Sequence, residues 1–173
     1  MLISDFKSKA RLYYNDDSPK SVIKTMLKDG STAIVLYRIM RFFASARLTP
    51  LAYLTQWLNK FLNQCLIGMN ADFGPGFVLI HPNGVIINSS VKGGSNILLE
   101  SCVVIGDNHG QSPILGSDIF IGSGAKIFGG LKIGDCCSIG ANAVVTKNVP
   151  DNHLAVGVPA TYRLKRPIEN PHE

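Results

Sequence analysis

The chain has 173 residues, which is about the size of one ordinary domain. Apolar residues make up 46% of it and charged residues 17%, a composition that excludes a disordered polyelectrolyte. The net charge of +5 is concentrated at one end, because residues 1–66 carry ten Lys/Arg against four Asp/Glu and residues 67–173 carry seven against eight.

The sequence shows no export or membrane signal. Residues 1–20 lack the continuous apolar segment of a signal peptide, and no run reaches the roughly 18 apolar residues of a membrane span. We therefore expect a cytoplasmic protein. The cysteines have the spacing of neither a zinc ribbon nor a thioredoxin motif, which favours a reducing compartment; they are Cys65, Cys102, Cys136 and Cys137.

Helix signals fill the first part of the chain. Ser18-Pro19 and Thr49-Pro50 each offer a capping residue followed by proline, and Gly30 separates two further segments. These signals predict helices at about 19–29, 32–46 and 50–66. The last of them has an apolar stripe at helical spacing, formed by Leu51, Tyr53, Leu54, Trp57, Leu58, Phe61, Leu62, Cys65 and Leu66.

From residue 73 the apolar pattern has a period of six. Twelve of thirteen positions in the series are large and apolar, and small residues recur four positions later. We expect one large and one small residue of each hexapeptide to point inward. Such a repeat predicts a parallel β-helix in which three hexapeptides close an 18-residue coil. We expect a helical region at 1–66, the β-helix at 67–150 and a capping tail at 151–173. The series is Phe73, Leu79, Val85, Val91, Ile97, Val103, His109, Leu115, Ile121, Ile127, Ile133, Ile139 and Val145, and the small residues are Ser89, Ser95, Ser101, Ala125, Cys137 and Ala143.

One segment interrupts the series. His109 replaces the expected apolar residue within "GDNHGQSP", residues 106–113. A polar stretch with glycine and proline cannot fill an apolar core position, so we expect it to leave the wall as a loop. Loops on rigid scaffolds often carry binding or catalytic residues, although a plain surface turn has the same composition.

Four stretches resemble the hexapeptide-repeat acyltransferases, and within them the serine acetyltransferase branch. They are "GPGFVLIHPNGVIIN", "VVIGDN", "PILGSDIFIGSGAKIFGGLKIGDCCSIGANAVVTKNVP" and "AVGVPA". The resemblance implies a left-handed β-helix and a homotrimer with active sites between subunits. It also implies transfer of an acetyl group from acetyl-CoA to a hydroxyl, with a histidine as general base.

The resemblance assigns roles to particular residues. His81 matches the catalytic histidine, whose imidazole takes a proton from the acceptor hydroxyl; a histidine that only closes a corner turn is the alternative. The matches on the CoA side are Gly106, Ser123 and Ala141, with Lys147 near the next corner, although corners of any β-helix also require small residues. Arg163, Lys165 and Arg166 are candidates for the CoA phosphates.

The chain departs from the serine acetyltransferase pattern at three places. Ile80 stands where an aspartate precedes the histidine, Leu66 or Ile67 where an orienting aspartate is expected, and Gln111-Ser112-Pro113 in the loop that holds the amino acid. We therefore expect a sugar of a surface polysaccharide or glycolipid precursor as acceptor. The basic N-terminal helices either make peripheral contact with an anionic membrane surface or only cap the β-helix with solvated polar faces. The candidate acceptor-binding residues are Asn83, Asn88, Asp107, Asn108 and His109.

Three alternatives remain open. The first is serine O-acetylation for cysteine biosynthesis. The second is a scaffold without catalysis, because His81 lacks its usual carboxylate partner, although Glu100 is a possible substitute. The third is a β-helix carbonic anhydrase, which needs three histidines on zinc; only His81 and His109 lie in the main run, with His153 and His172 beyond it. We expect no metal and no nucleic-acid partner.

Overall fold

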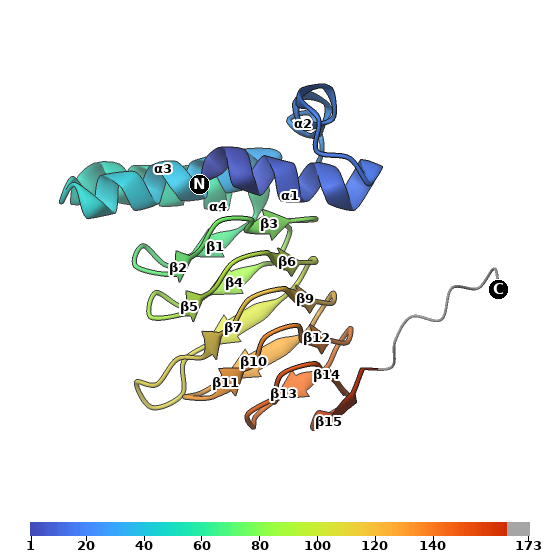
Figure 1. Ribbon diagram of the computed structural model, residues 1–173. Coiled ribbons are helices and arrows are strands. Elements are labelled where there is room, and N and C mark those ends of the chain that lie inside the picture. The colour runs from blue at the N-terminus through green and yellow to red at the C-terminus, as the bar shows by residue number, and fades with distance from the viewer. Residues whose placement is uncertain (166–173) are drawn as a thin grey trace.

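A computed structural model describes residues 1–165 and shows a helical cap on one end of a β-solenoid (Figure 1). The helices of this part of the chain are α1 (Leu2–Tyr14), α2 (Pro19–Thr25), α3 (Ser31–Ser45) and α4 (Thr49–Asn63). The last three lie close to the predicted segments, but α2 ends four residues early. Helix α1 escapes prediction because two of its four buried residues are charged, Asp5 and Lys9, so it has no apolar stripe.

The strands are short and wind around three flat faces. Pairing is parallel between neighbouring coils, except at the end of the described chain, where β15 pairs antiparallel with β14. Face A contains β1 (Leu66–Ile67), β4 (Ile86–Ile87), β7 (Val104–Gly106), β10 (Lys126–Phe128) and β13 (Val144–Val145). Face B contains β2 (Asp72–Phe73), β5 (Lys92–Gly93), β8 (Ile114–Leu115) and β11 (Lys132–Ile133). Face C contains β3 (Val78–Leu79), β6 (Ile97–Leu99), β9 (Ile119–Ile121), β12 (Ser138–Ile139), β14 (His153–Val156) and β15 (Thr161–Leu164).

These faces confirm the predicted parallel β-helix. The chain passes from face A to B to C and back to A on each coil, so its corners stack in three columns, which we call the AB, BC and CA edges. Solenoid pairing continues past residue 150, because β14 lies parallel to β12. Helices α1, α3 and α4 cover the first coil, and α2 lies on the far side of α1 (Figure 1). None of the described helices is long and apolar enough to cross a membrane.

The hexapeptide phase slips twice along the solenoid. Paired residues are 18 positions apart between β4 and β7, but 20 apart between β1 and β4 and 22 apart between β7 and β10. Two extra residues therefore lie in the corner that contains His81, and four lie in the loop around His109. Together they equal one hexapeptide, so the predicted series returns to phase at Leu115.

The slips change which residues fill the core. Each hexapeptide has two inward positions, two residues apart, as the fully buried Ala125 and Ile127 illustrate. All the apolar residues of the predicted series are buried. Those between the two slips, Val85 to Val103, occupy the first inward position of their hexapeptides, and the other residues of the series occupy the second inward position. The prediction that Ser89, Ser95 and Ser101 point inward is wrong, because the slip moves them to half-buried corner positions.

Buried polar contacts fasten the cap to the first coil. The Arg38 guanidinium binds both carboxylate oxygens of Asp5 and also donates to the carbonyls of Phe73 and Gly74. Asp5 accepts in turn from the backbone N–H groups of Gly76 and Phe77. A buried charge pair is tolerated when its remaining hydrogen bonds are satisfied. The open end of the solenoid is thus closed by specific partners.

The α2–α3 connection presses directly on β3. Gly30 has φ 77°, and a Cβ atom added to it would overlap the carbonyl oxygen of Leu79. Only glycine combines a left-handed backbone with such a close approach. This contact fixes the position of the neighbouring Asp29 relative to β3, which ends at Leu79.

We predict that Gly30→Ala lowers the free energy of unfolding by at least about 3 kcal/mol, because strain and steric overlap add. Gly110→Ala is the matched control, since Gly110 also has φ 77° but its added Cβ would meet no atom within 4 Å. Its expected loss is about 1 kcal/mol. Urea unfolding at one fixed protein concentration measures both, and equal losses would contradict the proposed close contact.

Candidate functional site

His81 lies on the CA edge, in the corner that follows β3. The Ile80 N–H donates to the carbonyl of Leu99 at 2.8 Å, which holds the start of this corner to the next coil. The extra residues of the corner carry the imidazole out of the wall, and its side chain is 52% exposed. The imidazole of His81 therefore points out of the solenoid wall.

The imidazole has a carboxylate partner that comes from the helical cap. His81 Nδ1 lies 2.8 Å from Asp29 Oδ2, and Asp29 belongs to the connection between α2 and α3. A carboxylate can only accept, so we assign the neutral imidazole's proton to Nδ1. Nε2 then carries a lone pair, which is the form that a general base requires.

Buried groups of α1 and α3 hold Asp29 in place. The Lys9 amine is buried and donates to the Asp29 carbonyl and, at 2.9 Å, to the hydroxyl of Ser31. The Ser31 hydroxyl donates to the carbonyl of Thr25 at 2.5 Å. Burial lowers the pKa of Lys9 to about 8, against the opposing effect of the Asp29 charge. The Asp29 carbonyl is thus tied to α1 through Lys9, whose amine is itself bonded to Ser31 of α3.

A second carboxylate lies on the same side of the molecule. Glu100 follows Leu99, which pairs with Leu79, so it occupies the coil next to His81. Burial raises the pKa of Tyr13, and the negative charges of Glu100 and then Asp29 raise it further, so both charges act on this hydroxyl. The carboxylate hydrogen-bonded to His81 belongs to Asp29, however, and the substitution by Glu100 is not observed.

The structure divides the candidate acceptor-binding residues between two edges. Asn83 lies with His81 on the CA edge, where its carbonyl accepts from the Cys102 N–H at 2.8 Å. The others lie on the AB edge, at the far end of face A, because β4 or β7 crosses that face before each of them. They are Asn88, Asp107, Asn108 and His109. A single chain therefore does not bring the predicted set together around His81.

The AB edge carries the predicted loop. Residues 107–113 leave the wall between β7 and β8, where backbone hydrogen bonds join Asn108 and Gln111 in both directions. The Asn88 side-chain oxygen accepts from the Ser112 hydroxyl at 3.2 Å, which ties the loop to the preceding coil. His109, at φ 53°, is exposed.

The candidate CoA-binding residues divide in the same way. Ser123 and Ala141 lie on the CA edge, and the Asn142 N–H donates to the Ser123 carbonyl at 2.8 Å, so their corners stack as predicted. This column continues from the corner of His81, since the Gly124 N–H donates to the carbonyl of Ser101 at 2.8 Å. Gly106 and Lys147 lie on the AB edge instead.

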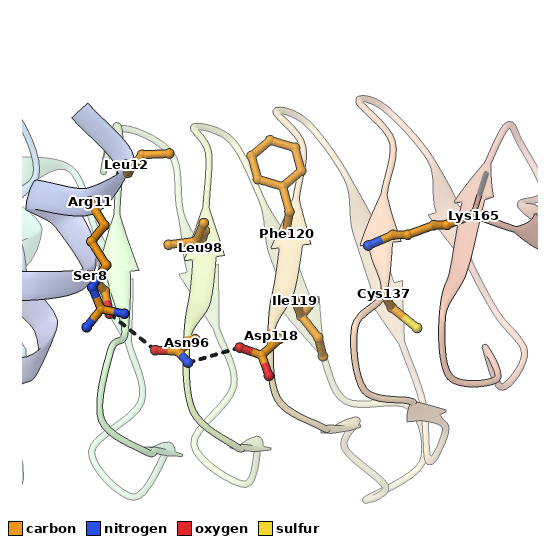
Figure 2. Close-up of a pocket in the computed structure, with 10 residues that line it drawn as sticks. All are labelled: Ser8, Arg11, Leu12, Asn96, Leu98, Asp118, Ile119, Phe120, Cys137 and Lys165. Carbon is orange, nitrogen blue, oxygen red and sulfur yellow. Dashed lines mark hydrogen bonds between the residues drawn. The ribbon is translucent and has the colours of Figure 1, made fainter. Parts of the chain in front are cut away.

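The basic residues of the tail lie on face C. Arg163 is opposite Leu154 in the β14–β15 pair. Lys165 reaches into a groove of about 340 Å³ beneath α1, and Arg11 lies at the opposite end of it (Figure 2). Leu98 and Phe120 of neighbouring coils form part of the groove wall. Arg166 falls outside the described residues.

The histidines do not support the carbonic anhydrase alternative. His81 is on the CA edge, His109 on the AB edge and His153 at the BC edge, so one described chain offers no site with three imidazoles. His172 lies outside the described residues. Within residues 1–165 no three His, Cys, Asp or Glu side chains are arranged to hold a metal ion.

Comparison with known proteins identifies the family. No family model matches the chain, but a serine acetyltransferase of Bacillus pumilus is 30% identical over 153 residues, which are 86% of this chain and 70% of the relative. The chain belongs to the serine acetyltransferase family. A serine acetyltransferase of Synechococcus elongatus is 29% identical over 91% of this chain. A serine acetyltransferase solved in complex with CoA superposes with a TM-score of 0.82 at 26% identity, over 93% of this chain and 68% of that chain.

The Synechococcus elongatus serine acetyltransferase is longer than this chain, which spans 66% of it. Family membership accounts for the solenoid and for the resemblance around His81. The carboxylate partner of this histidine, by contrast, escapes the sequence analysis, because Asp29 lies 52 positions earlier in a helical connection. The usable signal is the Asp29-Gly30 pair, which by itself indicates only a break between two helices.

Replacing Lys9 by Met tests whether the buried Lys9 amine holds the Asp29 carbonyl. The pKa of Lys9 is about 8 in the folded chain and 10.5 at its ordinary value. Between these values the unfolded chain binds more protons, so the folded state gains stability as the pH rises. Relative to Lys9→Met, the wild type should gain about 2 kcal/mol of unfolding free energy between about pH 7.5 and pH 10.

Denaturant unfolding of both proteins across this range measures the difference. A difference that does not change with pH would show that the amine is not buried as described. Lys7→Met is the matched control, since Lys7 is an exposed lysine of the same helix, and we expect its difference to stay nearly constant.

Proposed function

We propose that the chain is an acetyl-CoA-dependent O-acetyltransferase in which His81 is the general base and Asp29 orients it. The observation that carries this proposal is the contact of 2.8 Å between His81 Nδ1 and Asp29 Oδ2. It supports a neutral imidazole whose other nitrogen, Nε2, is free to accept a proton. A non-catalytic scaffold has no need of such a buried support for one exposed histidine.

The reaction balances with these groups alone. His81 Nε2 takes the proton of the acceptor hydroxyl as the oxygen attacks the thioester carbon of acetyl-CoA. The tetrahedral intermediate then collapses, the carbon–sulfur bond breaks, and the CoA thiolate receives the proton from the imidazolium. The Asp29 carboxylate stabilises the imidazolium while it exists. The products are the acetyl ester and free CoA.

Serine is the acceptor that the relatives favour. An amino acid needs a negative group for its ammonium, and two carboxylates on this side of the molecule offer one, Asp29 and Glu100. They offset the loss of the aspartate that Ile80 replaces, since Ile80 is 6% exposed and offers no polar group. The sugar acceptor expected from the sequence has no support among the relatives, and we propose L-serine in its place.

A trimer built on face A would complete the site. The outward residues of this face are mostly apolar, namely Leu66, Ile86, Val104 and Val144, with Ile86 46% exposed. In the same row the Lys126 amine folds back to the carbonyls of Cys102 and Gly124. Packing three such faces around an axis buries this apolar row, whereas the outward row of face B includes Asp72, Lys92 and Lys132.

Such a ring would set the CA edge of one subunit against the AB edge of the next. His81, Asn83, Ser123 and Ala141 of one subunit would then face the loop around His109 of its neighbour. Gly106 and Lys147 lie on the same edge as that loop, so the two divided sets of candidates would meet in one cleft. Acetyl-CoA would lie along it, with the thioester near His81.

Thiol release from acetyl-CoA tests the function. We expect turnover with L-serine, a loss of about 10²–10⁴-fold in kcat for His81→Ala, and a smaller loss of about 10–10²-fold for Asp29→Asn. His153→Ala is the matched control, since His153 lies at a different edge, and should keep wild-type turnover. Light scattering should give the mass of three chains for each protein, which also checks that the variants remain folded.

The possible failures are distinct. Full turnover by His81→Ala would overturn the general base. Turnover with a sugar and none with L-serine would keep the chemistry and overturn the acceptor. Absence of acetyl-CoA binding by calorimetry would favour the scaffold, and the mass of one chain would refute the trimer.

A further inference from the structure

Helix α4 is built with its polar side inward. Its buried residues are Ala52, Thr55 and Asn59. The Asn59 amide donates to the carbonyl of Ala33 at 3.2 Å, and the Gln56 amide donates to that of Ile67 at 2.7 Å. Helix α4 thus packs on α3 and on the first coil through small and polar groups, which reverses the usual arrangement of a surface helix.

The opposite side of α4 exposes large apolar side chains. The rings of Trp57 and Phe61 stack at 5.5 Å between centroids and are 58% and 71% exposed as residues. Leu54 and Leu62 continue this surface at 51% and 63% exposure. We call the surface of Leu54, Trp57, Phe61 and Leu62 the α4 face. Contiguous exposed apolar side chains of this size mark an interaction site.

The charges around the α4 face have one sign. No acidic residue occurs between Asp29 and Asp72, a stretch that includes all of α3 and α4. Arg38 and Arg41 of this stretch are paired with Asp5 and Asp72. Arg47 and Lys60 are exposed, and within residues 1–165 neither makes a salt bridge. The face therefore combines aromatic and aliphatic side chains with cations that have no carboxylate nearby in the sequence.

We propose that the α4 face docks on an anionic lipid surface, with Trp57 and Phe61 inserted at the headgroup level and Arg47 and Lys60 near lipid phosphates and carboxylates. Interfacial helices have this composition. A second copy of the same face is a poorer occupant, because both copies would bring only cations, Lys60 and Arg47, to the contact and no acidic partner. The proposal does not depend on the proposed acetyl transfer.

Sedimentation with vesicles tests the docking. We expect the wild type to bind vesicles of phosphatidylcholine with about one-third phosphatidylserine, to bind pure phosphatidylcholine more weakly, and to lose affinity as salt is raised. Trp57→Ser/Phe61→Ser should weaken binding by at least about tenfold. Arg47→Gln/Lys60→Gln should remove most of the preference for phosphatidylserine while leaving weak binding to both vesicles.

Ile114→Ser/Leu164→Ser is the matched control. It removes two apolar side chains that are 49% and 66% exposed but belong to β8 and β15, and its vesicle binding should equal that of the wild type. Binding that is unchanged in Trp57→Ser/Phe61→Ser would overturn the proposal. A wild type that ignores both vesicles, with an assembly mass that falls only in Trp57→Ser/Phe61→Ser, would assign the face to a second copy instead.

Discussion

The contact between the helical cap and the first coil is the constraint on which the candidate site depends. Gly30 lets the α2–α3 connection lie against the backbone of β3, and Lys9 ties the Asp29 carbonyl to α1 from the buried side. These contacts bring a carboxylate of the cap to an imidazole of the solenoid. A solenoid without its cap would carry His81 on an exposed corner without the Asp29 carboxylate. In this chain the candidate site therefore depends on the packing of the cap.

The repeat allowed the solenoid to be predicted because each hexapeptide meets the same packing requirement. The corner residues are less predictable. Two extra residues at one corner and four at another add up to one hexapeptide, so the apolar series keeps its period of six and both slips stay hidden. Helix α1 has no apolar period because it buries Asp5 and Lys9. The apolar stripe of α4 locates the helix but not its orientation, because hydrogen bonds of Gln56 and Asn59 turn the polar side inward.

The candidate site is likewise only partly predictable from one sequence. The stacking of Ser123 and Ala141 on one edge could be predicted from their spacing, since the corners of a regular solenoid repeat every 18 residues. Asp29 could not, because its partner is set by the packing of the cap and not by spacing along the chain. The AB-edge candidates stay predictions, since face A separates them from His81 in one chain and only the proposed neighbouring subunit would bring them next to it.

The central claim is that Asp29 fixes the tautomer of His81. Nitrogen-15 NMR of the imidazole near neutral pH measures this directly, with Asp29→Asn for comparison and His153 as an internal reference. We predict that neutral His81 carries its proton on Nδ1 in the wild type and becomes a mixture of tautomers in Asp29→Asn. Identical tautomer populations in the two proteins would contradict it.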